Sequence, residues 1–428
     1  MSSVSQTVVA FGKSGLPLQL PAGPQYEILH ARAADPLRDV GAALDAALDS
    51  PLGCAPLTEL ARGKRSAAIS VCDITRPAPN RITLPPLLER LHRAGLKREN
   101  ITLCIATGLH RQATPAELNE ILGSEIASSY PIANHDAKDF AAHRHVGDTH
   151  QGTKAYIDKR FLDADLHITL GFIEQHLMLG FSGGRKLIAP GLAAQETIKI
   201  IHSPRFMRES RAVECSIDDN PLHAELLEIA RMARHDFILD VTLTQDKSIS
   251  GIFAGEPVQA HAAGVRFLRD TSTVYLPQPA DAVITTGAGH PLDLTLYQTL
   301  KGTSAAQHIV KRGGPILTIG ECSEGIGSPE FTRMMSGYTS AQSFLDEIKD
   351  TPVIPDQWQM EKIALVGLKH PVLLYTPGVD PKQLGSLRET SYASVEEALR
   401  NLVSGLPPHA RVAVIPDGPY ACVRLRDA

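Results

Sequence analysis

The sequence predicts an α/β protein built from two α/β domains with mainly parallel, Rossmann-like sheets. Short, continuous apolar runs at 67–72, 101–106 and 166–171 alternate with helical segments. Continuous apolar strands between helices are typical of a parallel sheet that is covered on both faces. The chain has 428 residues, which is too long for one hydrophobic core, so we expect more than one domain.

The first domain is expected over residues 1–270. Short strands separated by Gly and Pro turns are predicted within 7–30, and a repeated pattern of strand, polar loop and helix follows. One helix has a clear start, because Thr114 can cap it, Pro115 suits its first position and Glu117 completes a capping box. The other predicted elements are helices at 37–48, 84–94, 220–234 and 257–269, and strands at 67–72, 101–106, 166–171 and 237–243.

A second strand-helix series predicts a second domain over residues 280–428, after a connector at 272–280. Its last strand could return to the first domain, and the sequence leaves that open. The predicted elements are strands at 282–286, 315–319, 371–376 and 411–415, and helices at 294–311, 329–336, 340–349 and 355–366.

Composition excludes several classes of function. The net charge is −5 and only 5% of residues are aromatic, so neither a nucleic-acid surface nor an acidic membrane is an expected partner. The N-terminus lacks the basic start and apolar core of a signal peptide, and no run of about 18 apolar residues predicts a membrane span. We therefore expect a cytoplasmic protein whose partner is a small molecule.

Four groups of polar residues follow predicted strands at their C-terminal ends. In open α/β sheets, ligands bind at that edge. The coincidence is more informative than any one group, because surface polar residues would not all choose that position. The groups are Asp73 with Arg76, His110 alone, His176 with Lys186 and His202, and Tyr297 with Gln298 and Lys301.

The residue types suggest several kinds of chemistry. The planar fork of Arg76 suits a carboxylate or phosphate, and a histidine such as His110 suits acid/base work near neutral pH. Lys186 follows Gly183 and Gly184, so its amine could attach a cofactor or form a Schiff base. Each residue also has a structural interpretation, namely an ion-paired surface arginine, a turn histidine and an ordinary surface lysine.

A denser histidine group comprises His135, His143, His145 and His150. On a strand, His143 and His145 would point to one face, where they could bind a metal. No carboxylate or cysteine stands at a characteristic spacing, so we expect these histidines on the surface. Neither a dinucleotide fingerprint nor a P-loop is present, so classical NAD and ATP sites are not supported.

The segments DITRP, TGLHR, GFIEQH, SGGRK, IIH and LYQTLKG, in this order, together resemble the nickel-pincer lactate racemase family. The resemblance implies two α/β domains with the active site in the cleft between them. It implies a nickel-pincer nucleotide, pyridinium-3,5-bisthiocarboxylic acid mononucleotide nickel, joined to a lysine and supplied by cofactor-synthesis enzymes. The implied activity is racemisation or epimerisation of a 2-hydroxy acid by proton-coupled hydride transfer.

The same resemblance assigns roles to single residues. Lys186 would carry the cofactor, Asp73 would lie in the loop that holds it, and His202 would be the nickel ligand. His110 and His176 would be the two catalytic bases, one for each enantiomer. The implied substrate-binding residues are Arg76, Tyr297, Gln298, Lys301 and Trp358.

Two other functions use the same residues. The His/Lys group could serve a metal-dependent hydrolase or a Schiff-base lyase without a nucleotide. The chain could also bind nickel or a nucleotide without catalysis. The sequence does not define the 2-hydroxy acid, because lactate, malate, aromatic and sugar acids all share the carboxylate-hydroxyl unit.

Overall fold

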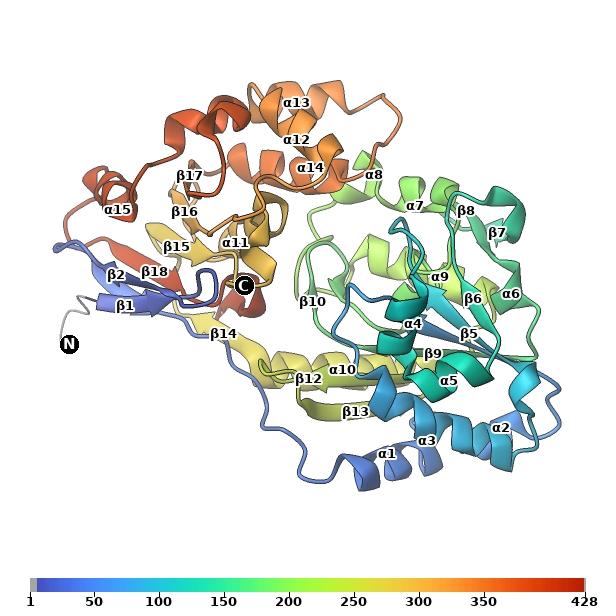
Figure 1. Ribbon diagram of the computed structural model, residues 1–428. Coiled ribbons are helices and arrows are strands. Elements are labelled where there is room, and N and C mark those ends of the chain that lie inside the picture. The colour runs from blue at the N-terminus through green and yellow to red at the C-terminus, as the bar shows by residue number, and fades with distance from the viewer. Residues whose placement is uncertain (1–5, 427–428) are drawn as a thin grey trace. The chain divides into compact units, whose positions relative to one another are not determined.

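The computed structural model describes residues 6–426, which form two compact units. One unit consists of residues 33–201 and 211–271, and the other of residues 1–32, 202–210 and 272–428. We call them the lysine unit and the tryptophan unit, after Lys186 and Trp358. Both contain a mainly or wholly parallel sheet covered by helices, so the expected α/β class is confirmed (Figure 1).

The lysine unit is organised around a six-stranded sheet with the order β13-β12-β9-β4-β5-β6. All neighbours run parallel except β12 and β13, which are antiparallel. In that order the strands are Ile249–Gly255, Phe237–Leu243, Leu166–Phe172, Ala67–Cys72, Ile101–Ala106 and Ile132–Asn134. Two antiparallel pairs lie outside the sheet, β7 (His143–Asp148) with β8 (Lys154–Asp158) and β10 (Gln175–His176) with β11 (Gly180–Phe181).

Alternation along β4 separates the two faces of this sheet. Ile69 and Val71 pack into a leucine-rich core with the first three helices. On the opposite face, the Ser70 hydroxyl donates to the Leu187 carbonyl oxygen at 2.8 Å, which fixes the segment that carries Lys186. The helices of this unit are α1 (Val40–Asp49), α2 (Leu57–Ala61), α3 (Asn80–Arg93), α4 (Pro115–Leu122), α5 (Ser124–Ser129), α6 (Lys159–Leu162), α7 (Gln195–Ile201), α9 (Pro221–Met232) and α10 (Pro257–Ser272).

The tryptophan unit contains a fully parallel five-stranded sheet with the order β17-β16-β15-β18-β3. Its strands are Val372–Tyr375, Ile316–Ile319, Ala282–Thr286, Arg411–Ile415 and Gln25–Ile28. Two further pairs are β1 (Gln6–Val9) with β2 (Leu16–Gln19), and β14 (Thr273–Leu276) with β19 (Cys422–Leu425).

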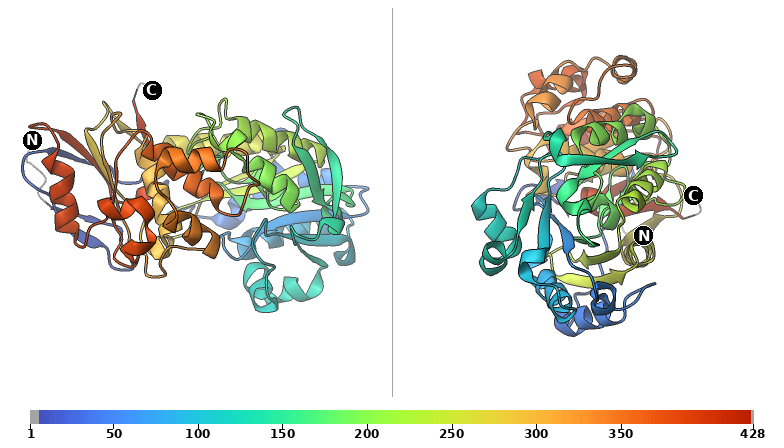
Figure 2. Two further views of the ribbon diagram at one scale, coloured as in Figure 1. Left: turned by 90° about the horizontal axis from the view of Figure 1, so that it is seen from above. Right: turned by 90° about the vertical axis from the view of Figure 1, so that its right-hand side faces the viewer.

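Helices cover both faces of this second sheet, as can be followed in Figure 2. Leu296 and Leu300 of α11 pack on one face together with Met360 and Ile363 of α14. On the other face, α15 packs its apolar side, including Leu399, against the sheet. The helices are α8 (Pro204–Met207), α11 (Leu296–Ala306), α12 (Pro329–Ser336), α13 (Ala341–Glu347), α14 (Gln357–Gly367) and α15 (Val395–Ser404).

The N-terminal segment differs from the expected division at 270–280. Residues 1–32, expected in the first domain, cluster with the C-terminal segment because β3 pairs with the edge of β18. The sequence left open whether the last strand returns to the first domain, and in the structure β18 and β19 both pair within the tryptophan unit. Within residues 6–426, no helix is both long and apolar enough to span a membrane.

Candidate functional site

Asp73 and His110 meet at the carboxyl ends of the neighbouring strands β4 and β5. Asp73 is 5% exposed, whereas the His110 side chain is 49% exposed. The His110 Nδ1–H donates to Asp73 Oδ2 at 2.8 Å, and the Thr75 hydroxyl donates to Asp73 Oδ1 at 2.7 Å. With Nδ1 as the donor, a neutral His110 has its lone pair on Nε2, so that atom can accept a proton.

The Asp73 carboxylate is held in its ionised form. Burial acts to raise its pKa, but the hydrogen bonds from His110 and Thr75 and the charge of Arg76 outweigh it, so the pKa is lowered. An ionised carboxylate keeps the His110 Nδ1–H as a donor and favours the imidazolium that forms when His110 takes up a proton. The arrangement therefore allows His110 Nε2 to accept a proton from a bound molecule.

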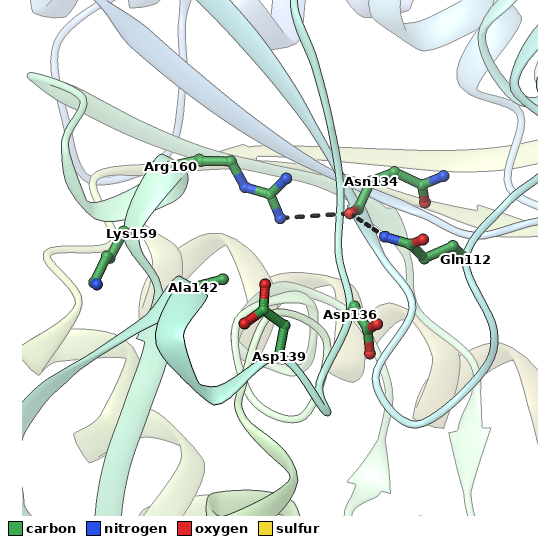
Figure 3. Close-up of a pocket in the computed structure, with 7 residues that line it drawn as sticks. All are labelled: Gln112, Asn134, Asp136, Asp139, Ala142, Lys159 and Arg160. Carbon is green, nitrogen blue, oxygen red and sulfur yellow. Dashed lines mark hydrogen bonds between the residues drawn. The ribbon is translucent and has the colours of Figure 1, made fainter.

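A pocket of about 410 Å³ opens beside His110. Its walls are formed by residues 108–112, which follow β5, and by residues 136–138, which follow β6. Gly108 has a φ of +56°, and its N–H donates to the Gly191 carbonyl oxygen at 3.0 Å, which turns the chain toward His110. A neighbouring pocket of about 300 Å³ shares Gln112 and Asp136 (Figure 3).

The segment before Lys186 requires glycine for a physical reason. Gly183 has a φ of +83°, and a Cβ there would lie 2.6 Å from Asp240 Oδ2. The same oxygen accepts the Gly184 N–H at 2.8 Å. Asp240 is fully buried on β12, so it anchors the Gly-Gly turn directly to the sheet. Burial raises the pKa of Asp240 to about 7, although the Gly184 N–H and the charge of Arg185 act to lower it.

Arg185 provides a second anchor for the same turn. Its side chain is 1% exposed, and its guanidinium donates to the carbonyl oxygens of residues 179, 181, 182 and 183. Its Nη1 also lies 2.7 Å from His261 Nε2. Burial lowers the pKa of Arg185 to about 9. Arg185 and Asp240 were not among the expected site residues, although Asp240 is the lone acidic residue within the apolar run FILDVTL.

Lys186 lies near the end of β4, together with Arg76. It is half-buried, whereas its neighbours Arg185 and Leu187 are buried. Burial raises the pKa of the Cys72 thiol to about 12, and the charges of Arg76 and Lys186 act in the opposite direction. Both cations therefore lie within electrostatic range of Cys72, at the sheet edge where Asp73 and His110 are found.

His176 lies on the short strand β10 of the same unit and is half-buried. The Leu179 N–H donates to its Nδ1 at 3.4 Å, which places the ring proton of a neutral His176 on Nε2. In this state Nε2–H is a hydrogen-bond donor. Nε2 can accept a proton only in the other tautomer, in which Nδ1 carries the proton. In that tautomer Nδ1 no longer accepts the Leu179 N–H.

In the tryptophan unit, Tyr297, Trp358 and His202 of the expected site residues are in contact with one another, and Gln298 and Lys301 lie on the same helix as Tyr297. The Trp358 Nε1–H donates to the Tyr297 hydroxyl oxygen at 3.1 Å. The His202 ring lies 4.5 Å from the Trp358 ring, centroid to centroid. Gln298 follows Tyr297 on α11, and its buried Oε1 has no hydrogen-bond partner. Lys301 is half-buried one turn later on the same helix.

Two polar contacts explain why His202 belongs to the tryptophan unit. The Arg208 Nε–H donates to the fully buried Glu361 at 2.8 Å, and the Lys362 ammonium donates to the Met207 carbonyl oxygen at 2.7 Å. These bonds fasten residues 202–210 to α14, the helix that carries Trp358. No local sequence pattern predicts these two hydrogen bonds, because their partners are more than 150 residues apart.

The histidine-rich segment differs from its expected surface location. His145 and His150 are exposed, as expected, but His135 is 0% and His143 5% exposed. The surface interpretation is therefore wrong for the latter two, whose ring nitrogens are buried in hydrogen bonds with each other and with Thr107 and a backbone carbonyl. Within residues 6–426, no group of three His, Cys, Asp or Glu side chains could hold a metal ion.

Both halves of the chain match models of known families. Residues 11–214 match the lactate racemase N-terminal domain, and residues 276–423 match the lactate racemase C-terminal domain. The chain belongs to the lactate racemase family. It is 33% identical to a lactate racemase of Thermoanaerobacterium thermosaccharolyticum over 97% of this chain and 98% of that one. It is 36% identical to a lactate racemase of Lactiplantibacillus plantarum over 88% of this chain and 89% of that one.

The solved structures agree with membership of the lactate racemase family. The lactate racemase apoprotein from T. thermosaccharolyticum has a TM-score of 0.89 and 32% identity, covering 98% of this chain and all of that one. A protein from Thermotoga maritima, with a TM-score of 0.61 and 17% identity over 86% of this chain and 96% of that one, shares the fold alone. The expected family and an isomerase of the racemase type are thereby confirmed.

Proposed function

We propose that this protein interconverts the enantiomers or epimers of a lactate-type 2-hydroxy acid. The relatives that match nearly the whole chain are named lactate racemases. The structural observation that carries the proposal is the Asp73–His110 pair at the edge of the parallel sheet. In that pair, His110 Nε2 takes the proton of the substrate hydroxyl, and Asp73 stabilises the resulting imidazolium.

The second proton transfer is assigned to His176. Reaction in both directions needs a base on each side of the reacting carbon, so one histidine is not sufficient. His176 lies on β10, after β9, whereas His110 follows β5. In its Nε2–H form, His176 donates a hydrogen bond to the substrate oxygen, and in the other tautomer it takes the hydroxyl proton of the opposite enantiomer.

The substrate carboxylate is assigned to Arg76 and Lys301. Arg76 can bind a carboxylate with two parallel hydrogen bonds, and Lys301 adds a second positive charge. A carboxylate held at one end lets the reacting carbon turn between the two bases without leaving the enzyme. Tyr297, Gln298 and Trp358 are proposed to contact the rest of the substrate, and the unpartnered Gln298 Oε1 can accept a substrate hydroxyl.

The residues present also fit the nickel-pincer nucleotide proposed as the cofactor. Lys186 offers a half-buried amine on a turn that is fixed to the sheet, which suits covalent attachment. His202 offers an imidazole, a common nickel ligand. When bound, the cofactor supplies reversible hydride acceptance, which avoids removing a proton from an unactivated carbon. Asp73 is proposed to lie against the cofactor as well as against His110.

Racemisation by the cofactor-loaded protein tests this function. Incubation with either enantiomer of lactate should give the same mixture, measured by chiral chromatography, and malate and sugar acids in the same assay define the substrate. The His110→Gln variant should be inactive, whereas His145→Gln, at an exposed histidine, should keep full activity. Retained optical purity of every acid, with an intact mass that shows full attachment at Lys186, would refute the function.

A second measurement separates this proposal from a Schiff-base lyase. Borohydride should trap no substrate on Lys186, because the proposal gives its amine to the cofactor. A trapped adduct in protein that lacks the cofactor would favour the lyase. Cytoplasmic localisation, the partnership with cofactor-synthesis enzymes and a site in the cleft between the domains stay predictions.

A further inference from the structure

Three buried side chains form a hydrogen-bonded chain behind the turn that carries His110. Thr107 is 2%, His135 0% and His143 5% exposed. The Thr107 hydroxyl lies 2.8 Å from His135 Nδ1 and 3.0 Å from the His135 carbonyl oxygen. His135 Nε2 lies 3.0 Å from His143 Nε2. None of these side chains has a role in the proposed chemistry.

The direction of each hydrogen bond follows from its terminal acceptor. His143 Nδ1 lies 2.8 Å from the Asp139 carbonyl oxygen, which can only accept, so Nδ1 carries a proton. In a neutral His143, Nε2 is then an acceptor, and His135 Nε2–H is its donor. The Thr107 hydroxyl shares its single proton between the His135 carbonyl oxygen and His135 Nδ1. All four ring nitrogens are therefore satisfied in one arrangement.

This chain connects the two walls of the pocket beside His110. Thr107 begins the turn, because the His110 N–H donates to the Thr107 carbonyl oxygen at 3.0 Å. His135 immediately precedes residues 136–138, which form the opposite wall. A second hydrogen bond connects the two walls: the Gln112 Nε2–H donates to the Asn134 carbonyl oxygen at 3.0 Å (Figure 3). The buried hydrogen-bonded chain therefore fixes the position of residues 108–112, which include His110, relative to residues 136–138.

We propose that His135 and His143 are positioning residues that hold His110 in contact with Asp73. The inference rests on the proposed function for the role of His110 as a base, and it adds residues that touch neither substrate nor cofactor. Burying imidazoles costs stability that apolar side chains would not cost. A polar network in which every group is hydrogen-bonded holds its residues in one geometry. Apolar side chains could not hold Thr107 in this way, because they cannot form a hydrogen bond with it.

Paired substitutions separate positioning from general stability. His143→Phe removes the acceptor for His135 Nε2–H, whereas His143→Gln can present an amide oxygen there. Thr107→Val removes the hydroxyl at nearly constant volume, whereas Thr107→Ser keeps it. His145→Gln, on the same strand as His143 but exposed, is the matched control.

The Asp73 carboxyl reports on the position of His110, because the His110 hydrogen bond helps to lower its pKa. Titration by NMR of the protein without cofactor should show a raised Asp73 pKa in His143→Phe and Thr107→Val. The Gln and Ser variants and the control should titrate as wild type does. In loaded enzyme, the same two variants should lose about 10- to 100-fold in kcat with little change in KM.

The outcomes distinguish this inference from the proposed function. If folded Thr107→Val, the milder of the two disruptive variants, titrates at Asp73 as wild type does and keeps its kcat, His135 and His143 are structural only and the inference is wrong. If wild-type protein racemises no acid, the proposed function fails. The Asp73 titration then still decides whether the buried pair positions His110.

Discussion

Replacing Asp240 by asparagine should remove a pH-dependent loss of stability from the protein. Asp240 is fully buried, and one carboxyl oxygen accepts the Gly184 N–H while the other, Oδ1, has no hydrogen-bond partner. Burial raises its pKa from 3.8 to about 7. Asparagine keeps the shape and an oxygen acceptor for Gly184, but it carries no titrating proton.

The sign follows from comparing the folded and unfolded states. The pKa of Asp240 is about 7 in the folded protein and 3.8 in the unfolded chain. The carboxyl group therefore makes its full contribution to stability below pH 3.8, and this contribution is lost as the pH rises through about 7. One pKa unit corresponds to about 1.4 kcal/mol. Between pH 5 and pH 8, the Asp240 contribution to the free energy of unfolding should therefore fall by roughly 2.5 kcal/mol.

Urea unfolding at several pH values between 5 and 8 measures this contribution. The difference in unfolding free energy between wild type and Asp240→Asn should change by about that amount over the range. The variant is expected to be less stable at pH 5, where wild type holds a protonated carboxyl, and to lose less stability toward pH 8. Asp35→Asn, at an exposed position, is the control and should parallel wild type. Parallel curves for Asp240→Asn and wild type would show that Asp240 is ionised throughout, and the reasoning would be refuted.

Three further substitutions have defined outcomes. Asp73→Asn should lower kcat by about 10²- to 10⁴-fold in a racemisation assay, because His110 loses the charge that stabilises its imidazolium; an unchanged kcat would contradict that role. Gly183→Ala should cost at least 1–2 kcal/mol in urea unfolding, since its φ of +83° disfavours any side chain and its Cβ would meet a buried carboxylate. Tyr297→Phe should cost about 1 kcal/mol in the same measurement by removing the acceptor for the Trp358 indole, and an unaltered midpoint would show that this bond contributes nothing.

Local sequence patterns predicted the elements that depend on local physics. The strands expected at 67–72 and 101–106 coincide with β4 and β5. A short continuous apolar run between polar loops is typical of a fully buried strand. The start of α4 at Pro115 was predicted equally well, and its capping box at Thr114 and Glu117 is present. Both signals are complete within a few residues of sequence.

Features that depend on distant partners were not predictable in this way. No local pattern shows that Gln25–Ile28 pairs with a strand close to the other end of the chain. His135 and His143 were expected on the surface because no carboxylate or cysteine stood at a metal-ligand spacing from them, and hydrogen bonds to each other, to Thr107 and to a backbone carbonyl make their burial tolerable. In the candidate site, Asp73 and His110 each follow a predicted strand, and this position correctly predicted that both lie at one edge of the sheet. The sequence did not show that they form a hydrogen bond with each other.

The pairing of β3 with β18 has a consequence for the order in which the protein folds. The partners of β3 are made almost a full chain length later, so this edge of the five-stranded sheet cannot form until synthesis is nearly complete. The lysine unit, whose segments end at residue 271, can fold while the ribosome is still translating the remainder. During that time β3 lacks its partner strand, which makes Gln25–Ile28 a segment that is accessible to chaperones and proteases in the nascent protein.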